Sequence, residues 1–118
     1  MITDLENYYL KQPEPTQGCL LALRSIIMHA DENITHHRKY QIPFFYYKNW
    51  KLCFLWVKQK KLYLGFVEDR KIFPPSPDRK TNNIVMLHIK PAEDLPIEEI
   101  LENTTRLIAL YDSHVKAK

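Results

Sequence analysis

One segment, residues 39–66, constrains the fold of this chain more than any other. Its sequence, KYQIPFFYYKNWKLCFLWVKQKKLYLGF, holds ten of the fourteen aromatic residues of the chain. Aromatic and β-branched residues favour strands, whereas Lys48-Asn49 and Gln59-Lys60 have the pattern of tight turns. The segment therefore predicts strands over residues 44–48, 51–58 and 61–67, joined as antiparallel hairpins.

The rest of the chain completes an α+β pattern. Thr3, with Glu6 three positions later, predicts a helix over 3–11, and apolar stripes at helical spacing predict helices over 20–28 and 96–111. Pro15 fits the first turn of the second helix, although Gly18 weakens the pattern of that turn. Further strands are expected over 34–40 and 84–89, and a proline-rich loop over 68–83. We therefore expect one domain over residues 1–118. It is a two-layer α+β fold with about five antiparallel strands and N-terminal and C-terminal helices packed on one face.

The central strands are apolar on both faces. Phe54 and Trp56 alternate with Cys53 and Leu55 along one strand. If the helices cover one face only, the second face is too apolar to be left to water. That second face is the expected binding surface.

Charge is distributed unevenly along the chain. The formal net charge of +3 combines a basic segment, +9 over residues 33–90, with balances of −3 over residues 1–32 and −3 over 91–118. If these segments form different layers, the molecule has a strong dipole. Cys19 and Cys53 lie among apolar residues, which favours reduced thiols. The sequence has no signal-peptide pattern and no apolar run of the roughly 20 residues that a membrane span needs, so we expect a cytoplasmic protein without a membrane partner.

Several motifs resemble those of the YdhG-like family, small bacterial domains grouped with frataxin-like folds. They are K-Y-x-x-P-F-F-Y-Y-K, then L-C-F-L-W-V and L-Y-L-G-F, together with Gln12-Pro13-Glu14-Pro15 and Leu95-Pro96-Ile97-Glu98-Glu99-Ile100. The resemblance spans nearly the whole chain and implies a frataxin-like fold and, by analogy with frataxin, an iron-chaperone role. The family loop typically reads K-Y-G-M-P, so Gln41 replaces a glycine here, which argues against a positive φ at this turn.

Five candidate metal ligands lie within nine residues: His29, Asp31, Glu32, His36 and His37. Imidazole and carboxylate groups suit iron, zinc or manganese. The same residue types are also common at helix ends and turns, and His36 and His37 point to opposite faces if they lie on a strand. Iron or another divalent metal is therefore kept as an alternative ligand, and no other cofactor is indicated.

Nucleic acid and catalysis are the remaining alternatives. Lysines among aromatic residues suit phosphates and stacked bases, but rings also pack sheets and lysines also guard turns and edges. No complete catalytic signature is present in the sequence. Cys53 and His88 would form a nucleophile–base pair only if neighbouring strands brought them together. We expect a non-enzymatic protein.

The main hypothesis is a binding domain whose open sheet face takes a small ligand or a protein partner. The expected walls of the site are Lys39, Tyr40, Pro43, Tyr47, Trp56, Tyr63 and Gly65. Glycine permits close approach to the sheet, the rings give apolar walls with polar tips, and Lys39 meets an anion. This hypothesis predicts a pocket that contacts Trp56 and Tyr63. Homodimerisation through the same face is a second use of it.

Overall fold

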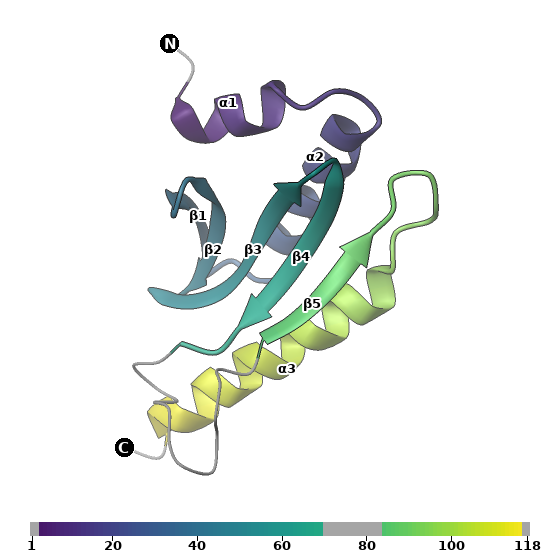
Figure 1. Cartoon of the computed structure of the whole chain (residues 1–118). Coiled ribbons are helices and arrows are strands. Elements are labelled where there is room, and N and C mark those ends of the chain that lie inside the picture. Colours follow the sequence, from purple (N-terminus) through teal and green to yellow (C-terminus); the bar gives the residue numbers. More distant parts are fainter. Residues whose placement is uncertain (1–2, 70–83, 117–118) are drawn as a thin grey trace, which may run out of the picture.

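The computed structural model describes residues 3–69 and 84–116, in which three helices lie on one face of a five-stranded antiparallel sheet (Figure 1). The elements are α1 (Asp4–Leu10), α2 (Thr16–Met28), β1 (Ile34–Lys39), β2 (Ile42–Tyr47), β3 (Trp50–Lys58), β4 (Lys61–Val67), β5 (Ile84–Ile89) and α3 (Ile97–Lys116). The strands are ordered β1-β2-β3-β4-β5, and each neighbouring pair is antiparallel. The expected two-layer α+β fold is confirmed. The expected loop at 68–83 lies, from residue 70 on, outside the described residues.

The first two helices begin where the sequence supplies acceptors for their first N–H groups. The hydroxyl of Thr3 accepts the N–H of Glu6 at 3.1 Å, as the capping pattern predicts. Helix α2 begins at Thr16 with Pro15 at its N-cap, close to the expected place of Pro15 in the first turn. The carboxylate of Glu14 accepts the N–H of Gly18 at 2.6 Å and satisfies a donor of this turn, which glycine alone would weaken. Over the described residues, no helix combines the length and the apolar character that crossing a membrane requires.

The space between the two layers is filled by apolar side chains from both. Fully buried members of this core include Leu20, Leu23, Ile27, Phe45, Leu55, Leu64, Phe66, Ile89, Ile100 and Leu107. Burying one such side chain contributes about 1.5–3 kcal/mol to stability. The helix side of the sheet therefore carries the core.

A bulge between β2 and β3 decides which side chains face the helices. Phe45 lies opposite Cys53 and Tyr46 opposite Lys51, so Leu52 is an extra residue in β3. Leu52 and Cys53 follow each other in sequence, yet both are fully buried. Simple alternation along β3 therefore fails at this point.

Helix α1 is docked onto the sheet by two tyrosines. The hydroxyl of Tyr8 accepts the backbone N–H of Val57 at 3.1 Å. The hydroxyl of Tyr9 shares a hydrogen bond of 2.8 Å with Nε2 of His36, whose ring stacks on Phe45 at 4.4 Å between centroids. Burial lowers the pKa of His36 to about 4, so its ring is neutral at neutral pH.

Helix α3 is fastened to the sheet by a buried tyrosine. The hydroxyl of Tyr111 accepts the backbone N–H of Asp69 at 2.8 Å and donates to the carbonyl of Lys51. The carboxylate of Asp69 in turn accepts the backbone N–H of Lys51 at 2.9 Å. These bonds hold together the start of β3, the chain after β4 and the second half of α3.

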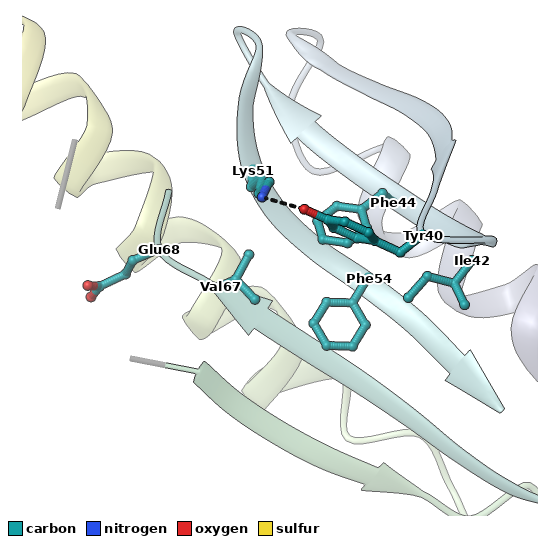
Figure 2. A pocket seen from close by; sticks show the side chains of 7 residues that line it. All are labelled: Tyr40, Ile42, Phe44, Lys51, Phe54, Val67 and Glu68. Carbon is teal, nitrogen blue, oxygen red and sulfur yellow. Dashed lines mark hydrogen bonds between the residues drawn. The ribbon is translucent and has the colours of Figure 1, made fainter. Parts of the chain in front are cut away.

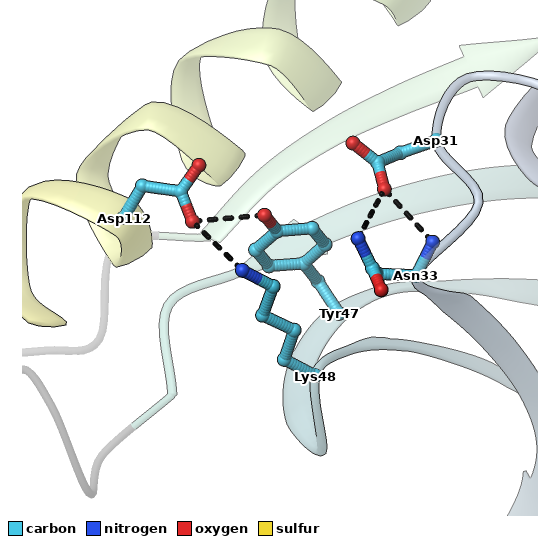
Figure 3. Close-up of polar contacts among 5 residues, drawn as sticks. All are labelled: Asp31, Asn33, Tyr47, Lys48 and Asp112. Carbon is cyan, nitrogen blue, oxygen red and sulfur yellow. Dashed lines mark hydrogen bonds and ion pairs between the residues drawn. The ribbon is translucent and has the colours of Figure 1, made fainter.

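A second polar link joins β2 to α3 (Figure 3). The hydroxyl of Tyr47 donates to Oδ1 of Asp112 at 2.8 Å, and the same oxygen lies 3.7 Å from Nζ of Lys48. Burial, followed by the contact with Asp112, raises the pKa of Tyr47, so its hydroxyl keeps its proton and donates. Nearby, the carboxylate of Asp31 accepts the backbone and side-chain N–H groups of Asn33 and closes the turn before β1.

All three hairpin turns have positive φ at both central residues. The φ values are 55° and 64° at Tyr40 and Gln41, 50° and 73° at Lys48 and Asn49, and 51° and 66° at Gln59 and Lys60. Two-residue hairpins favour this type I′ geometry because its twist matches that of the flanking strands. The expectation against a positive φ at Gln41 is therefore wrong. The two-residue loop favours a positive φ at this position even though the residue is not glycine.

Candidate functional site

The described helices leave the opposite sheet face uncovered, and we call it the open face. Its side chains are Thr35, His37, Lys39, Tyr40, Ile42, Phe44, Tyr46, Lys51, Phe54, Trp56, Lys58, Lys61, Tyr63, Val67, Ile84, Met86 and His88, with Gly65 among them. Rings and lysines dominate this set. The open face therefore differs in chemistry from the aliphatic core on the other side of the same strands.

Rings on the open face pack against one another across the strands. Phe44 and Phe54, which are register partners, stack with 5.4 Å between centroids. A second row crosses three strands: the centroids of Trp56 and Tyr63 are 5.8 Å apart, and those of Tyr63 and His88 are 5.1 Å apart. Such cross-strand contacts hold the rings in place and add to the stability of the sheet.

Gly65 makes room for one of these rings. A Cβ atom at this position would lie 2.3 Å from Cζ of Phe54 and 2.8 Å from Sδ of Met86. The ring of Phe54 therefore lies directly over the backbone of β4, and a side chain here would push it away. Gly65 allows another group to approach the sheet closely, as the sequence suggests, but that group is the ring of Phe54 and not a ligand.

A pocket of about 380 Å³ lies on the open face beside this ring (Figure 2). It is lined by Tyr40, Ile42, Phe44, Lys51, Phe54, Val67 and Glu68. Figure 2 shows the rings of Tyr40 and Phe44 on one side of the pocket and Val67 with Glu68 on the other. The volume falls within the range of small-ligand sites, and the mixture of apolar walls with a few charged groups is typical of them.

Two lysines surround the most exposed ring of the pocket. Tyr40 is 67% exposed, and its hydroxyl accepts a hydrogen bond from Nζ of Lys51 at 3.3 Å. The ammonium groups of Lys39 and Lys51 each lie 5.4 Å from the centre of the Tyr40 ring. An aromatic surface with two cations beside it suits an anionic ligand that also carries a flat apolar part.

The sheet as a whole is basic. None of the five strands contains an aspartate or glutamate, whereas together they contain Arg38, Lys39, Lys51, Lys58 and Lys61. Arg38 lies 3.6 Å from the carboxylate of Asp4 in α1. The four lysines belong to the open face, so its electrostatic potential favours anions.

The expected walls of the site are divided between the two faces. Lys39, Tyr40, Trp56, Tyr63 and Gly65 belong to the open face, and Tyr40 also lines the pocket. Pro43 and Tyr47 are buried on the helix side, where the hydroxyl of Tyr47 bonds Asp112. The pocket is lined by Phe54, whose ring lies over Gly65, and not by the expected Trp56 and Tyr63.

The proposed metal ligands do not converge. His29 binds the carbonyl of Ser25 through Nδ1 at 2.8 Å, and Asp31 accepts the two N–H groups of Asn33. The five candidates contain no group of three or more that could hold an ion, and the same is true of all described histidines, cysteines and carboxylates. Glu32 lies exposed in the turn before β1.

The two histidines of β1 point to opposite faces, as expected for a strand. His36 bonds Tyr9 on the helix side, and His37 lies 5.7 Å from the ring of Tyr46. The same alternation separates Cys53 from His88. Cys53 is fully buried in β3, where burial raises the pKa of its thiol, whereas His88 is exposed on β5. The nucleophile–base pair is therefore not formed.

Comparison of the chain with protein-family models, with curated proteins and with solved structures finds no match. The resemblance to the YdhG-like family therefore stays a prediction, and the function is argued from the open face.

Proposed function

We propose that the chain is a non-enzymatic binding domain whose open face takes a small anionic ligand with a flat apolar part. The pocket beside Phe54 is the observation that carries this proposal, because it combines aromatic walls with Nζ of Lys51. Lys51 would pair with the charged group of the ligand, and Tyr40 and Phe54 would contact its apolar part. A positively charged sheet without strand carboxylates supports the choice of an anion.

The experiment is a titration of the ¹⁵N-labelled protein with benzoate, indole-3-acetate and adenosine monophosphate, followed by two-dimensional NMR. We expect at least one of these anions to shift the amide signals of Tyr40, Lys51 and Phe54 together. Lys51→Met should weaken that binding about tenfold or more, since a charge-assisted hydrogen bond contributes roughly 1.5–3 kcal/mol.

Lys90→Met is the matched control, because Lys90 is exposed and lies outside the pocket. It removes the same charge and should leave the affinity unchanged. Signal shifts that are absent, or that are spread over the helices, would rule the proposal out.

A second copy of the chain is the competing occupant of the same face. On the edge strand β5, Ile84 is 48% exposed and Met86 is 41% exposed, which suits a protein contact. Sedimentation would then show the mass of a monomer at low protein concentration and that of a dimer at high concentration. Met86→Lys would keep the chain monomeric. A monomer at all concentrations would leave the small ligand as the proposed occupant.

A further inference from the structure

The open face holds a second ring cluster that the pocket does not use. Trp56, Tyr63 and His88 form one row across β3, β4 and β5. Trp56 and Tyr63 are half-buried and His88 is exposed. Nζ of Lys58 lies 5.3 Å from the centre of the Trp56 ring. A ligand confined to the pocket of about 380 Å³ would leave this row and its lysine without a role.

Two lysines lie directly opposite each other next to this row. Lys58 and Lys61 are register partners flanking the turn between β3 and β4, and both are exposed. Like charges at opposite positions of an antiparallel pair repel and lower stability. A bound anion between the two ammonium groups would attract both of them and offset this repulsion.

The open face thus presents cations at two places with rings between them. Lys39 and Lys51 flank the pocket, and Lys58 and Lys61 flank the ring row. Two separated cationic places suit a polyanion better than a compact ligand. An acidic peptide would use the lysines but not the rings. A single-stranded nucleic acid carries one flat ring for every charge, and protein sites for it combine basic tracks with aromatic stacking.

We propose that the open face binds single-stranded nucleic acid, with phosphates on Lys39, Lys51, Lys58 and Lys61 and bases against Phe54, Trp56 and Tyr63. This inference rests on the proposed function, since the pocket would take one nucleotide of the strand. A duplex would bind less tightly, because its bases are already paired and stacked.

The experiment measures the fluorescence anisotropy of a fluorescein-labelled twelve-residue oligothymidylate, with a duplex of equal length and heparin as competitors. We expect the oligonucleotide to bind more tightly than thymidine monophosphate. Its bases should also quench the fluorescence of Trp56. The logarithm of the association constant should fall with the logarithm of salt concentration with a slope of about −3, from roughly −0.7 for each of four lysines.

Two sets of variants separate charge from stacking. Lys58→Glu/Lys61→Glu should weaken binding at least tenfold and make the salt slope shallower by about 1.4. Lys11→Glu/Lys90→Glu changes the net charge equally, away from the open face, and should change the affinity by less than threefold. Trp56→Leu should weaken binding about tenfold with the slope unchanged, because it removes a stacking surface and no charge.

Each outcome decides between the two proposals. If adenosine monophosphate or another small anion shifts the pocket signals but the oligonucleotide binds no more tightly, this inference fails and the proposed function stands. If neither binds, both fail. If heparin competes equally and Trp56→Leu has no effect, the face binds polyanions without reading bases, and the inference is overturned. Lys58→Gln/Lys61→Gln, checked for folding by NMR, repeats the test if the charge reversal unfolds the chain.

Discussion

At the scale of single residues, the surface of the open face depends on a position that has no side chain. Gly65→Ala places a methyl group where Cζ of Phe54 now lies, so the ring has to move. Overpacking of this kind costs about 1–3 kcal/mol. We expect a loss of that size in the free energy of unfolding, measured in urea. Phe54→Leu/Gly65→Ala should recover part of it, and an unchanged stability of Gly65→Ala would contradict this packing.

His36 is the residue from which we expect a specific pH dependence. Burial lowers its pKa from 6.5 to about 4, so below pH 6.5 the unfolded chain takes up a proton that the folded chain does not. The free energy of unfolding should therefore fall as the pH falls from about 6.5 to about 4. The ring is partly exposed and solvent screens it, which leaves a contribution on the order of 1–2 kcal/mol.

The measurement is urea unfolding at pH 7 and pH 4.5. His36→Phe should lose this part of the difference between the two pH values, while keeping the stacking on Phe45. His37→Phe changes the neighbouring histidine on the open face and should keep most of the difference, because burial is the main cause of the lowered pKa of His36 and the charge of His37 only a smaller one. Equal pH dependence of both variants would show that other groups cause it.

At the scale of elements, the hairpin turns store strain that can be removed. Gln59 and Lys60 both have positive φ, which costs an ordinary L-residue about 1–2 kcal/mol. Asn-Gly is the favoured pair for this geometry, so Gln59→Asn/Lys60→Gly should raise the free energy of unfolding by about 1 kcal/mol. Thr35→Gly, on the exposed side of β1, should lower it. A turn variant no more stable than the parent would mean that this turn is not strained.

The elements themselves could be predicted from the sequence almost to the residue. The two strands after Asn49, expected over 51–58 and 61–67, are observed as β3 (Trp50–Lys58) and β4 (Lys61–Val67). Turn residues and apolar periodicity are local signals, so they fix where an element begins and ends. Pro15 indicates the start of α2, whereas Gly18 weakens the helical pattern of the first turn, and the bond from Gly18 to Glu14 that supports this turn is not visible in apolar spacing.

The site could be predicted only in part. Placing Trp56 and Tyr63 on the open face was correct, because alternation holds from Cys53 onward through β3 and β4. The prediction places Pro43 and Tyr47 on the wrong side, since both faces of β2 are apolar and only contacts with the helix layer, such as those of Tyr47 with Tyr111 and Asp112, distinguish them. Phe54 and Lys51 were missed as pocket residues because the bulge at Leu52 and the fit over Gly65 are tertiary features.

At the scale of the whole molecule, charge separates by layer. The strands carry only basic charges, whereas α1 and α3 contain Asp4, Glu6, Glu98, Glu99, Glu102 and Asp112. The uneven charge of the sequence thus becomes a dipole between a basic sheet and acidic helices. A polyanion approaching from solution would be oriented toward the open face, and this steering weakens as salt is added.

The two layers should also unfold together. The ring centroids of Trp50 and Tyr111 are 5.4 Å apart at the contact between the sheet and α3, whereas Trp56 lies on the open face. Trp50→Phe and Trp56→Phe each leave one tryptophan as a fluorescence probe. We expect both probes to report an all-or-none transition whose midpoint coincides, within each variant, with that of circular dichroism. Separate midpoints would show that the sheet surface and the helix layer unfold independently.

The ring of Phe54 above the backbone of Gly65 has a spectroscopic consequence. A proton held over an aromatic ring is shielded by the ring current, and the Cβ position of Gly65 points at Cζ of Phe54. One of the two α-protons of Gly65 should therefore resonate well upfield of its usual position. A molecule that enters the pocket and tilts the ring would move that signal back. The chain thus carries a built-in reporter of occupancy that needs no label.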